Sequence, residues 1–278
     1  MPREPKFDRI GYWSELKLDI IQEYARAYST ILAAQKNPSL YHVYIEGFSG
    51  MGVHLSKANK GFILGSPLNA LNVRPPFREY HLIDIEPGKI DSLKRLIGKR
   101  DDVRLHPGDC NKILLEEVFP QVKYEEYRRG LCILDPYGLD LDWNVISTAG
   151  CQRTLDVFLN FPVMDINRNV LWRNPDKVGA AQIARMNAFW GDESWRNIAY
   201  RTDTNLFELP EKQANDVIAE AFRARLQKVA GFARVPNPLA MRNSTGAIVY
   251  YLFFASQKDT AEHIILHIFK KYENLGAN

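Results

Sequence analysis

Five short segments of the chain are strongly apolar, either with alternating polar residues or without interruption. They lie at residues 41–46, 80–84, 103–106, 131–135 and 154–160. Runs of this length that are rich in Val, Ile, Leu, Tyr and Phe are typical of strands. The segment 131–135 is apolar throughout its first four positions, as expected of a strand buried on both faces. We therefore predict five strands here.

Segments with helical spacing separate these strands. An amphipathic helix is predicted at residues 12–36, and others at 90–97 and 111–118. The stretch 53–64 is predicted to be irregular, and Ser66 is predicted to cap a helix that has Pro67 in its first position. Strands that alternate with helices favour right-handed βαβ units and a parallel sheet.

The last third of the chain follows a different pattern. Residues 165–230 are predicted to be a mostly helical insertion, followed by strands at 232–241 and 248–255 and a helix at 260–272. The tight turn between the two strands requires an antiparallel pair. Five parallel strands and a terminal hairpin are the order expected of an α/β, Rossmann-like class I methyltransferase fold. We expect one such domain over residues 1–278, with the N-terminal helix 12–36 and the insertion 165–230.

Composition and charge narrow the class of protein. The 278 residues are 46% hydrophobic and 25% charged, which is ordinary for a soluble globular protein. No apolar run reaches the ~18 residues of a membrane span, and the N-terminus lacks the apolar core of a signal peptide, so a cytoplasmic location is expected. The net charge of +3 is much smaller than that of a strongly basic nucleic-acid-binding protein, so only a local basic patch could bind nucleic acid.

The sequence does not predict a metal site. Its three cysteines are widely spaced and form no Cys-x-x-Cys pair, so neither a disulfide framework nor a zinc site is expected. His263 and His267 are four residues apart but lack the glutamate of a His-Glu-x-x-His motif. We interpret both as packing or surface residues.

The first strand ends in an acid and a glycine turn, Glu46-Gly-Phe-Ser-Gly-Met-Gly52. Glycines at the carboxyl end of a parallel strand let the backbone approach a ligand. A carboxylate there would repel a pyrophosphate but suits a cationic or hydroxyl-bearing ligand. This favours S-adenosylmethionine over a dinucleotide, whereas a tight strand–helix turn without a ligand remains the alternative.

Polar residues at the following strand ends extend this candidate site. Asp84 is expected to accept hydrogen bonds from both ribose hydroxyls. Asp109 is expected to accept one from the adenine amino group, and Cys110 is expected to contribute its backbone to the same part of the site. The alternative for Asp84 and for Asp109 is a helix N-cap. Gly50 and Gly52 would let the main chain approach the methionine part. The predicted cofactor-binding residues are Glu46, Phe48, Gly50, Gly52, Ser66, Asp84, Asp109 and Cys110.

The fourth strand ends in Asp135-Pro136-Tyr137, which resembles the Asp-Pro-Pro-Tyr motif of amino-methyltransferases. In that motif the acid or the next backbone carbonyl accepts hydrogen bonds from an exocyclic amine, and the aromatic ring stacks on the base. Positioning carries much of the rate, so no strong general base is needed. Here the second proline is absent and a glycine follows the tyrosine. A structural Pro-Gly turn is the alternative.

An aromatic group in the insertion has two interpretations. Trp172, Phe189, Trp190 and Trp195 occur among several arginines. Such neighbours could stack on bases and hold phosphates. Because nearby acids balance much of the charge, we favour a packed helical segment.

Six motifs together resemble one family. They are Tyr44–Gly52, Gly65–Leu68, Leu82–Asp84, Gly108–Cys110, Leu134–Leu139 and Phe189–Trp195. In this order they look like the three-Cys-motif partner family, TcmP, over nearly the whole chain. Glu46 stands where many relatives have Asp, Gly47 replaces a larger apolar residue, and Asp84 stands where the family often has Glu. Both acidic replacements, at positions 46 and 84, keep the negative charge that the relatives have there.

The resemblance implies a methyltransferase-like fold and a three-Cys-motif partner protein that resembles radical S-adenosylmethionine enzymes. Three functions remain open. The first is an S-adenosylmethionine-dependent methyltransferase acting on a base amine of DNA or RNA, with Asp135, Pro136 and Tyr137 as catalytic residues. The second is a non-catalytic partner module in a nucleic-acid repair or modification system. A nicotinamide oxidoreductase is disfavoured, because Glu46 replaces an apolar strand end and the third glycine of the fingerprint is missing.

Overall fold

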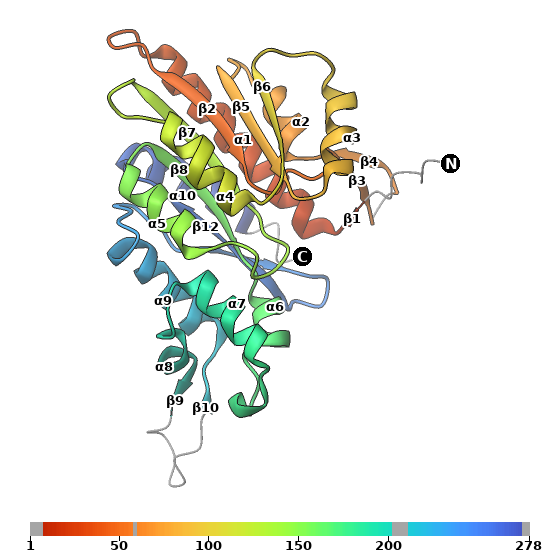
Figure 1. Ribbon diagram of the computed structural model, residues 1–278, viewed down its shortest axis with the longest axis vertical. Coiled ribbons are helices and arrows are strands. Elements are labelled where there is room, and N and C mark those ends of the chain that lie inside the picture. Colours follow the sequence, from red (N-terminus) through yellow and green to blue (C-terminus); the bar gives the residue numbers. More distant parts are fainter. Residues whose placement is uncertain (1–7, 58–59, 202–210, 274–278) are drawn as a thin grey trace.

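The computed structural model describes residues 8–57, 60–201 and 211–273. Seven strands form a central sheet in the order β6–β5–β2–β7–β8–β12–β11 (Figure 1). The first five are mutually parallel, and β12 runs antiparallel to both of its neighbours. This confirms the predicted class I order with its terminal hairpin. In sheet order, the strands are Val103–Pro107, Glu79–Asp84, Tyr41–Glu46, Arg128–Leu134, Leu155–Phe161, Ile248–Ala255 and Leu239–Arg242.

Three local predictions are wrong. The strand predicted at 232–241 is confined to β11, because Pro236 and Pro238 have no N–H to give to a sheet ladder. The stretch 53–64 holds β3 (Val53–Ser56) and β4 (Phe62–Leu64), which form a small sheet with β1 (Arg9–Ile10). Gly65, and not Ser66, is the N-cap of α2 (Ser66–Leu71). The stretch 53–64 forms strands because β3 pairs with the distant β1. Ser66 does not cap α2 because its hydroxyl donates to Glu46 instead.

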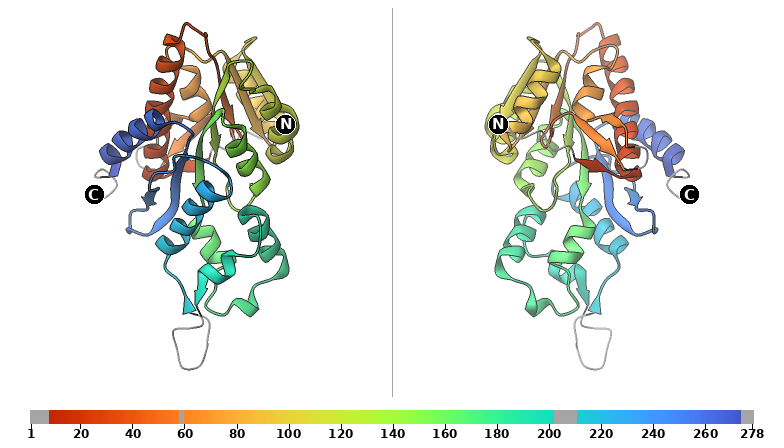
Figure 2. Two further views of the ribbon diagram at one scale, coloured as in Figure 1. Left: turned by 90° about the vertical axis from the view of Figure 1, so that its left-hand side faces the viewer. Right: turned by 90° about the vertical axis from the view of Figure 1, so that its right-hand side faces the viewer.

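Helices cover both faces of the sheet (Figure 2). Strand alternation sends Val43 and Ile45 to one face and Tyr44 to the other, so each face is apolar. Tyr44 belongs to a core shared with α1 (Tyr12–Ala34), α2, α3 (Pro87–Ile97) and α10 (Asp259–Glu273). The opposite core is shared with α4 (Cys110–Ile113), the π-helix η1 (Leu114–Val118), the 3₁₀ turn η2 (Phe119–Gln121) and α5 (Trp143–Gln152).

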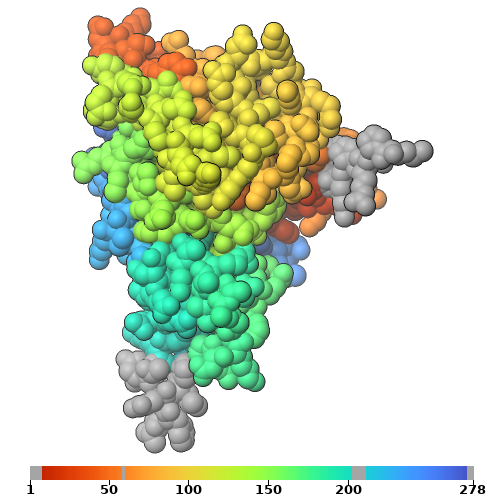
Figure 3. Space-filling model, viewed as in Figure 1, coloured from red at the N-terminus to blue at the C-terminus, as the bar shows by residue number. Residues whose placement is uncertain are grey.

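The segment after β8 forms a narrower lobe beyond the carboxyl ends of the parallel strands (Figure 3). It contains α6 (Val163–Asn169), η3 (Pro175–Lys177), α7 (Ala180–Trp190), α8 (Trp195–Ala199), an antiparallel pair β9 (Tyr200–Arg201) and β10 (Glu211–Lys212), and α9 (Asn215–Lys228). Phe189, Trp190 and Trp195 are buried, which confirms packing for these three, whereas Trp172 is 41% exposed. Among the described residues, no helix is both long and apolar enough to cross a bilayer.

Candidate functional site

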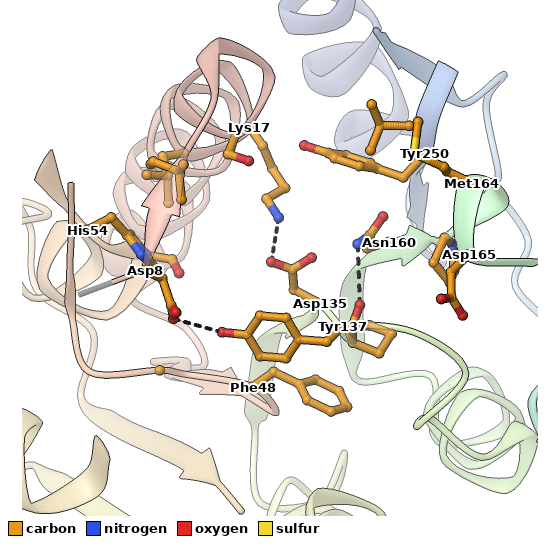
Figure 4. Close-up of a pocket in the computed structure, with 18 of the residues that line it drawn as sticks. Asp8, Lys17, Phe48, His54, Asp135, Tyr137, Asn160, Met164, Asp165 and Tyr250 are labelled. Carbon is orange, nitrogen blue, oxygen red and sulfur yellow. Dashed lines mark hydrogen bonds and ion pairs between the residues drawn. The ribbon is translucent and has the colours of Figure 1, made fainter. Parts of the chain in front are cut away.

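A cavity of about 330 Å³ lies where the strand order reverses. From β2 the chain builds outward through β5 and β6, and it then returns to the other side of β2 with β7. Ligands of open α/β sheets bind at such a switch point, beyond the carboxyl ends of the strands. The walls come from the start of α1, the turn after β2, the loop after β7, the end of β8, the start of β12, and α6 (Figure 4).

The Asp-Pro-Tyr segment forms one wall of this cavity. Leu134 pairs with Leu159 in the parallel register, so the next residues, Asp135 and Asn160, lie side by side. The Asn160 amide donates to the carbonyl of Pro136 at 3.5 Å. Since a carbonyl can only accept, this contact leaves Asn160 Oδ1, which is buried and unpartnered among the described residues, as a free acceptor.

Asp135 forms an ion pair with Lys17 of α1, a contact that sequence analysis missed. Lys17 is only 8% exposed and lies in the buried stripe of α1, in line with Tyr24 and Tyr28. A lysine within the apolar stripe of a helix needs an acidic partner, so the sequence does indicate that Lys17 pairs with a buried acid. The sequence did not identify the acid, because 118 residues separate the two partners.

Breaking this ion pair should destabilise the protein. The Lys17 and Asp135 side chains are 11% and 30% exposed, so solvent screens the pair only in part. Lys17→Met should lower the free energy of unfolding in urea by about 1–3 kcal/mol, because it leaves an unpaired carboxylate. The double variant Lys17→Met/Asp135→Asn should recover most of this loss. A single-variant change below about 0.5 kcal/mol would show that the pair contributes nothing in solution.

Glu46 lies beside the cavity but does not line it. Strand alternation places its side chain on the same face as Tyr44, under α1 and α2. It accepts hydrogen bonds from the Tyr44 hydroxyl at 3.0 Å and from the Ser66 hydroxyl, and Ser66 itself lines the cavity. Burial raises the pKa of Glu46 to about 8, so the folded protein holds this carboxyl largely protonated near neutral pH.

The glycine turn and Asp84 form one unit. Asp84 Oδ2 accepts from the Gly50 N–H and Oδ1 from the Glu86 N–H, both at 2.9 Å. Gly50 has φ +63° and open space where a Cβ would lie, and it lines the cavity. Gly52 has φ +83°, and a Cβ there would meet Leu93 Cδ1 at 2.6 Å. Asp84 is 4% exposed and does not line the cavity; its observed contacts stabilise the turn.

Asp109 and Cys110 also lie outside the cavity wall. Asp109 caps α4 by accepting from the Asn111 N–H at 3.0 Å, which is the alternative that the sequence left open for it. Cys110 is buried, and burial raises the pKa of its thiol. A thiol in that state is a packing group rather than a nucleophile.

Residues from distant segments complete the cavity. Tyr137 is 65% exposed at its edge, and its hydroxyl donates to Asp8 at 3.3 Å (Figure 4). The Lys89 ammonium lies 5.0 Å from the Tyr137 ring centroid. Burial lowers the pKa of His54, which keeps its ring neutral near pH 7. No motif in the sequence predicts a role in the site for Asp8 or His54.

The structure therefore divides the predicted site residues into two groups. Those that line the cavity are Phe48, Gly50, Ser66, Asp135, Pro136 and Tyr137. Those that lie behind or outside its wall are Glu46, Gly52, Asp84, Asp109 and Cys110.

No protein-family model matches the sequence, and no curated protein sequence matches it significantly. The protein LPL1258 from Legionella pneumophila is 12% identical over 93% of each chain, with a TM-score of 0.45. A SAM-dependent methyltransferase from Leishmania major is 9% identical over 86% of this chain and 72% of its own (TM-score 0.40). The plantazolicin methyltransferase BamL, in complex with SAH, is 12% identical over 88% of each chain (TM-score 0.36). At these identities and scores, the likeness carries no information about activity.

Proposed function

We propose that this protein is an S-adenosylmethionine-dependent methyltransferase that acts on an amino nitrogen of a nucleic-acid base. The observation that carries the proposal is the place of Asp135-Pro136-Tyr137. This segment follows β7 and forms the wall of a cavity at the switch point of a sheet with class I methyltransferase order.

The residues of the glycine turn are compatible with this cofactor. Ser49 lines the cavity and is 3% exposed, and its hydroxyl has no hydrogen-bond partner within the described part of the chain. The missing Cβ of Gly50 leaves room for a ligand against the backbone. When bound, S-adenosylmethionine supplies an electrophilic methyl group. Ser49, Gly50 and Ser66 would hold it beside the Asp-Pro-Tyr segment.

Unpartnered oxygen atoms line the part of the cavity where the substrate that receives the methyl group would bind. Asn160 Oδ1 and Asp165 Oδ2 are buried without a partner among the described residues, and Asp135 stands beside Asn160. An amine offers N–H donors to such oxygens, whereas an alcohol offers one and a thioether none. The exposed ring of Tyr137 at the edge of the cavity provides a surface on which a base could stack. These features support an exocyclic amine of DNA or RNA as the acceptor.

The second candidate is a non-catalytic module that serves a three-Cys-motif protein, as the resemblance to the TcmP family implies. Two contacts favour it. Lys17 pairs with Asp135, the carboxylate that a substrate amine would use, and Asp8 accepts from Tyr137. Catalysis would require the first contact to rearrange when substrate binds.

A matched pair of glycine variants tests the cofactor site. Gly50→Ala places a methyl group in open space beside the cavity, so it should weaken S-adenosylmethionine binding by about tenfold or more and cost only about 1 kcal/mol of stability. Gly52→Ala meets Leu93, so it should cost about 2–3 kcal/mol of stability. Calorimetric titration with S-adenosylmethionine, S-adenosylhomocysteine and NAD, together with urea unfolding, measures both effects. Equal cofactor affinity in wild type and Gly50→Ala would contradict this placement, and tighter binding of NAD would contradict the cofactor.

Methyl transfer is tested with labelled S-adenosylmethionine and mixed DNA and RNA, with and without the three-Cys-motif protein. Label in base amines supports the enzyme. Cofactor binding without transfer under both conditions would support the non-catalytic module.

A further inference from the structure

A second cavity, of about 340 Å³, lies at the opposite end of the parallel strands, where their amino ends are. It opens where β7 and β8 begin and where β12 ends, between the C-terminal half of α1 and the first turn of α10. The helix α1 lines both cavities, with Lys17 at the first and Tyr28 at the second, about 16 Å apart along the helix axis. The second cavity is therefore separate from the candidate methyltransferase site.

One part of this cavity is apolar. Its volume falls in the range of small-molecule sites. The apolar lining comes mainly from α1 and α10 and includes Tyr24, Tyr28, Leu32, Leu155, Ala261 and Ile264.

The other part carries excess positive charge. Arg129, Arg153 and Lys258 line the cavity, and none of them forms an ion pair with a carboxylate in the described ranges. The acid in the wall is Asp156, which accepts hydrogen bonds from Tyr24 at 2.7 Å and from Ser256. The first turn of α10 adds Thr260 and Ala261, and the amino end of a helix favours a negative charge.

Two further features at the start of β8 indicate a ligand. Thr154 is 3% exposed and lines the cavity, yet its hydroxyl has no hydrogen-bond partner among the residues that the structure describes. Arg153 caps α5 in the left-handed conformation, φ 58°, where glycine is the usual residue. A strained backbone position and an unpartnered buried hydroxyl each require a physical reason, and a ligand in this cavity would supply one.

We propose that this second cavity binds a small amphipathic anion. Arg129, Arg153 and Lys258 hold its carboxylate, the Thr154 hydroxyl donates to it, and its apolar chain packs between α1 and α10. This proposal does not depend on the methyltransferase activity.

The test is calorimetric titration of the full chain with decanoate, with decan-1-ol as its uncharged counterpart, and with inorganic phosphate. Decanoate should bind at least about tenfold more tightly than decan-1-ol, because a charged hydrogen-bonding group is present in only one of them. Phosphate should not bind detectably, since it has no apolar body. Equal affinities for decanoate and decan-1-ol, strong phosphate binding, or no decanoate binding would each overturn the proposal.

Two variants tie the binding to this cavity. Arg153→Gly should weaken decanoate binding by about tenfold, and the melting temperature should not fall, because glycine accommodates the left-handed backbone. Thr154→Val keeps the shape of the side chain and should weaken binding by about fivefold. Two controls, Arg95→Ala on the exposed side of α3 and Asp165→Asn in the first cavity, should bind as wild type does. If both cavity variants keep wild-type affinity, decanoate binds elsewhere and the proposal fails.

Discussion

Asp135→Asn should reduce methyl transfer to nucleic acid by about 10²- to 10⁴-fold, with S-adenosylmethionine affinity close to that of wild type. Either oxygen of the carboxylate can accept a hydrogen bond from an N–H of the substrate amine. In the asparagine variant, the amide NH₂ replaces one of these oxygens and would face an N–H donor of the substrate. The cofactor-side residues Ser49, Gly50 and Ser66 come from other segments of the chain, so their placement does not depend on Asp135. The loss should therefore appear in transfer and not in cofactor binding.

A matched control lies in the same loop. Asp140 pairs with Arg185 at 2.8 Å and does not line the cavity, so Asp140→Asn should keep wild-type transfer. Transfer is measured with labelled cofactor, and cofactor affinity and melting temperature are measured on the same preparations. An Asp135→Asn protein that retains more than about a tenth of wild-type transfer would rule out a catalytic role for this carboxylate.

Glu46→Gln should remove a large pH dependence of stability. Burial is the main cause of the raised pKa of Glu46, about 8 in the folded protein against an ordinary 4.5, and the hydroxyls of Ser66 and Tyr44 offset it only in part. Between these two values the folded state keeps a proton that the unfolded state has lost. The contribution of this group is therefore fully present below about pH 4.5 and is lost as pH rises through 8. The loss amounts to about 4–5 kcal/mol, at 1.4 kcal/mol for each pKa unit.

Urea unfolding at pH 5, 6.5 and 8 measures this slope. Glutamine mimics the protonated carboxyl, so the variant should become more stable than wild type as pH rises. The partly buried His54 and the buried His81, whose pKa values burial lowers, oppose the trend, and the difference between wild type and variant isolates Glu46. The control Glu86→Gln, on a side chain that is 63% exposed, should keep the wild-type slope. Parallel curves for wild type and Glu46→Gln would show that Glu46 is ionised in the fold.

Much of the architecture follows from local sequence. Apolar runs and helical spacing predict the strands of the parallel sheet, because side-chain alternation and amphipathic faces are properties of neighbouring residues. The tight turn before β12 requires its antiparallel partner. The same local patterns predict Glu46, Asp84 and Asp135 at strand ends, and the structure places each at or directly after the end of its strand.

Tertiary structure alone decided what these strand-end residues do in the fold. Lys17 reaches Asp135 from a helix 118 residues earlier, and Ser66 gives its hydroxyl to Glu46 instead of capping its own helix. Asp84 holds the backbone of Gly50 and so stabilises the turn from behind the cavity. Burial of a polar group without a partner costs free energy, so most buried polar groups pair wherever packing brings a partner within reach. Local sequence determines where a carboxylate stands on its strand, whereas the packing of distant helices and loops determines which donors reach it and which side chains remain open to a ligand.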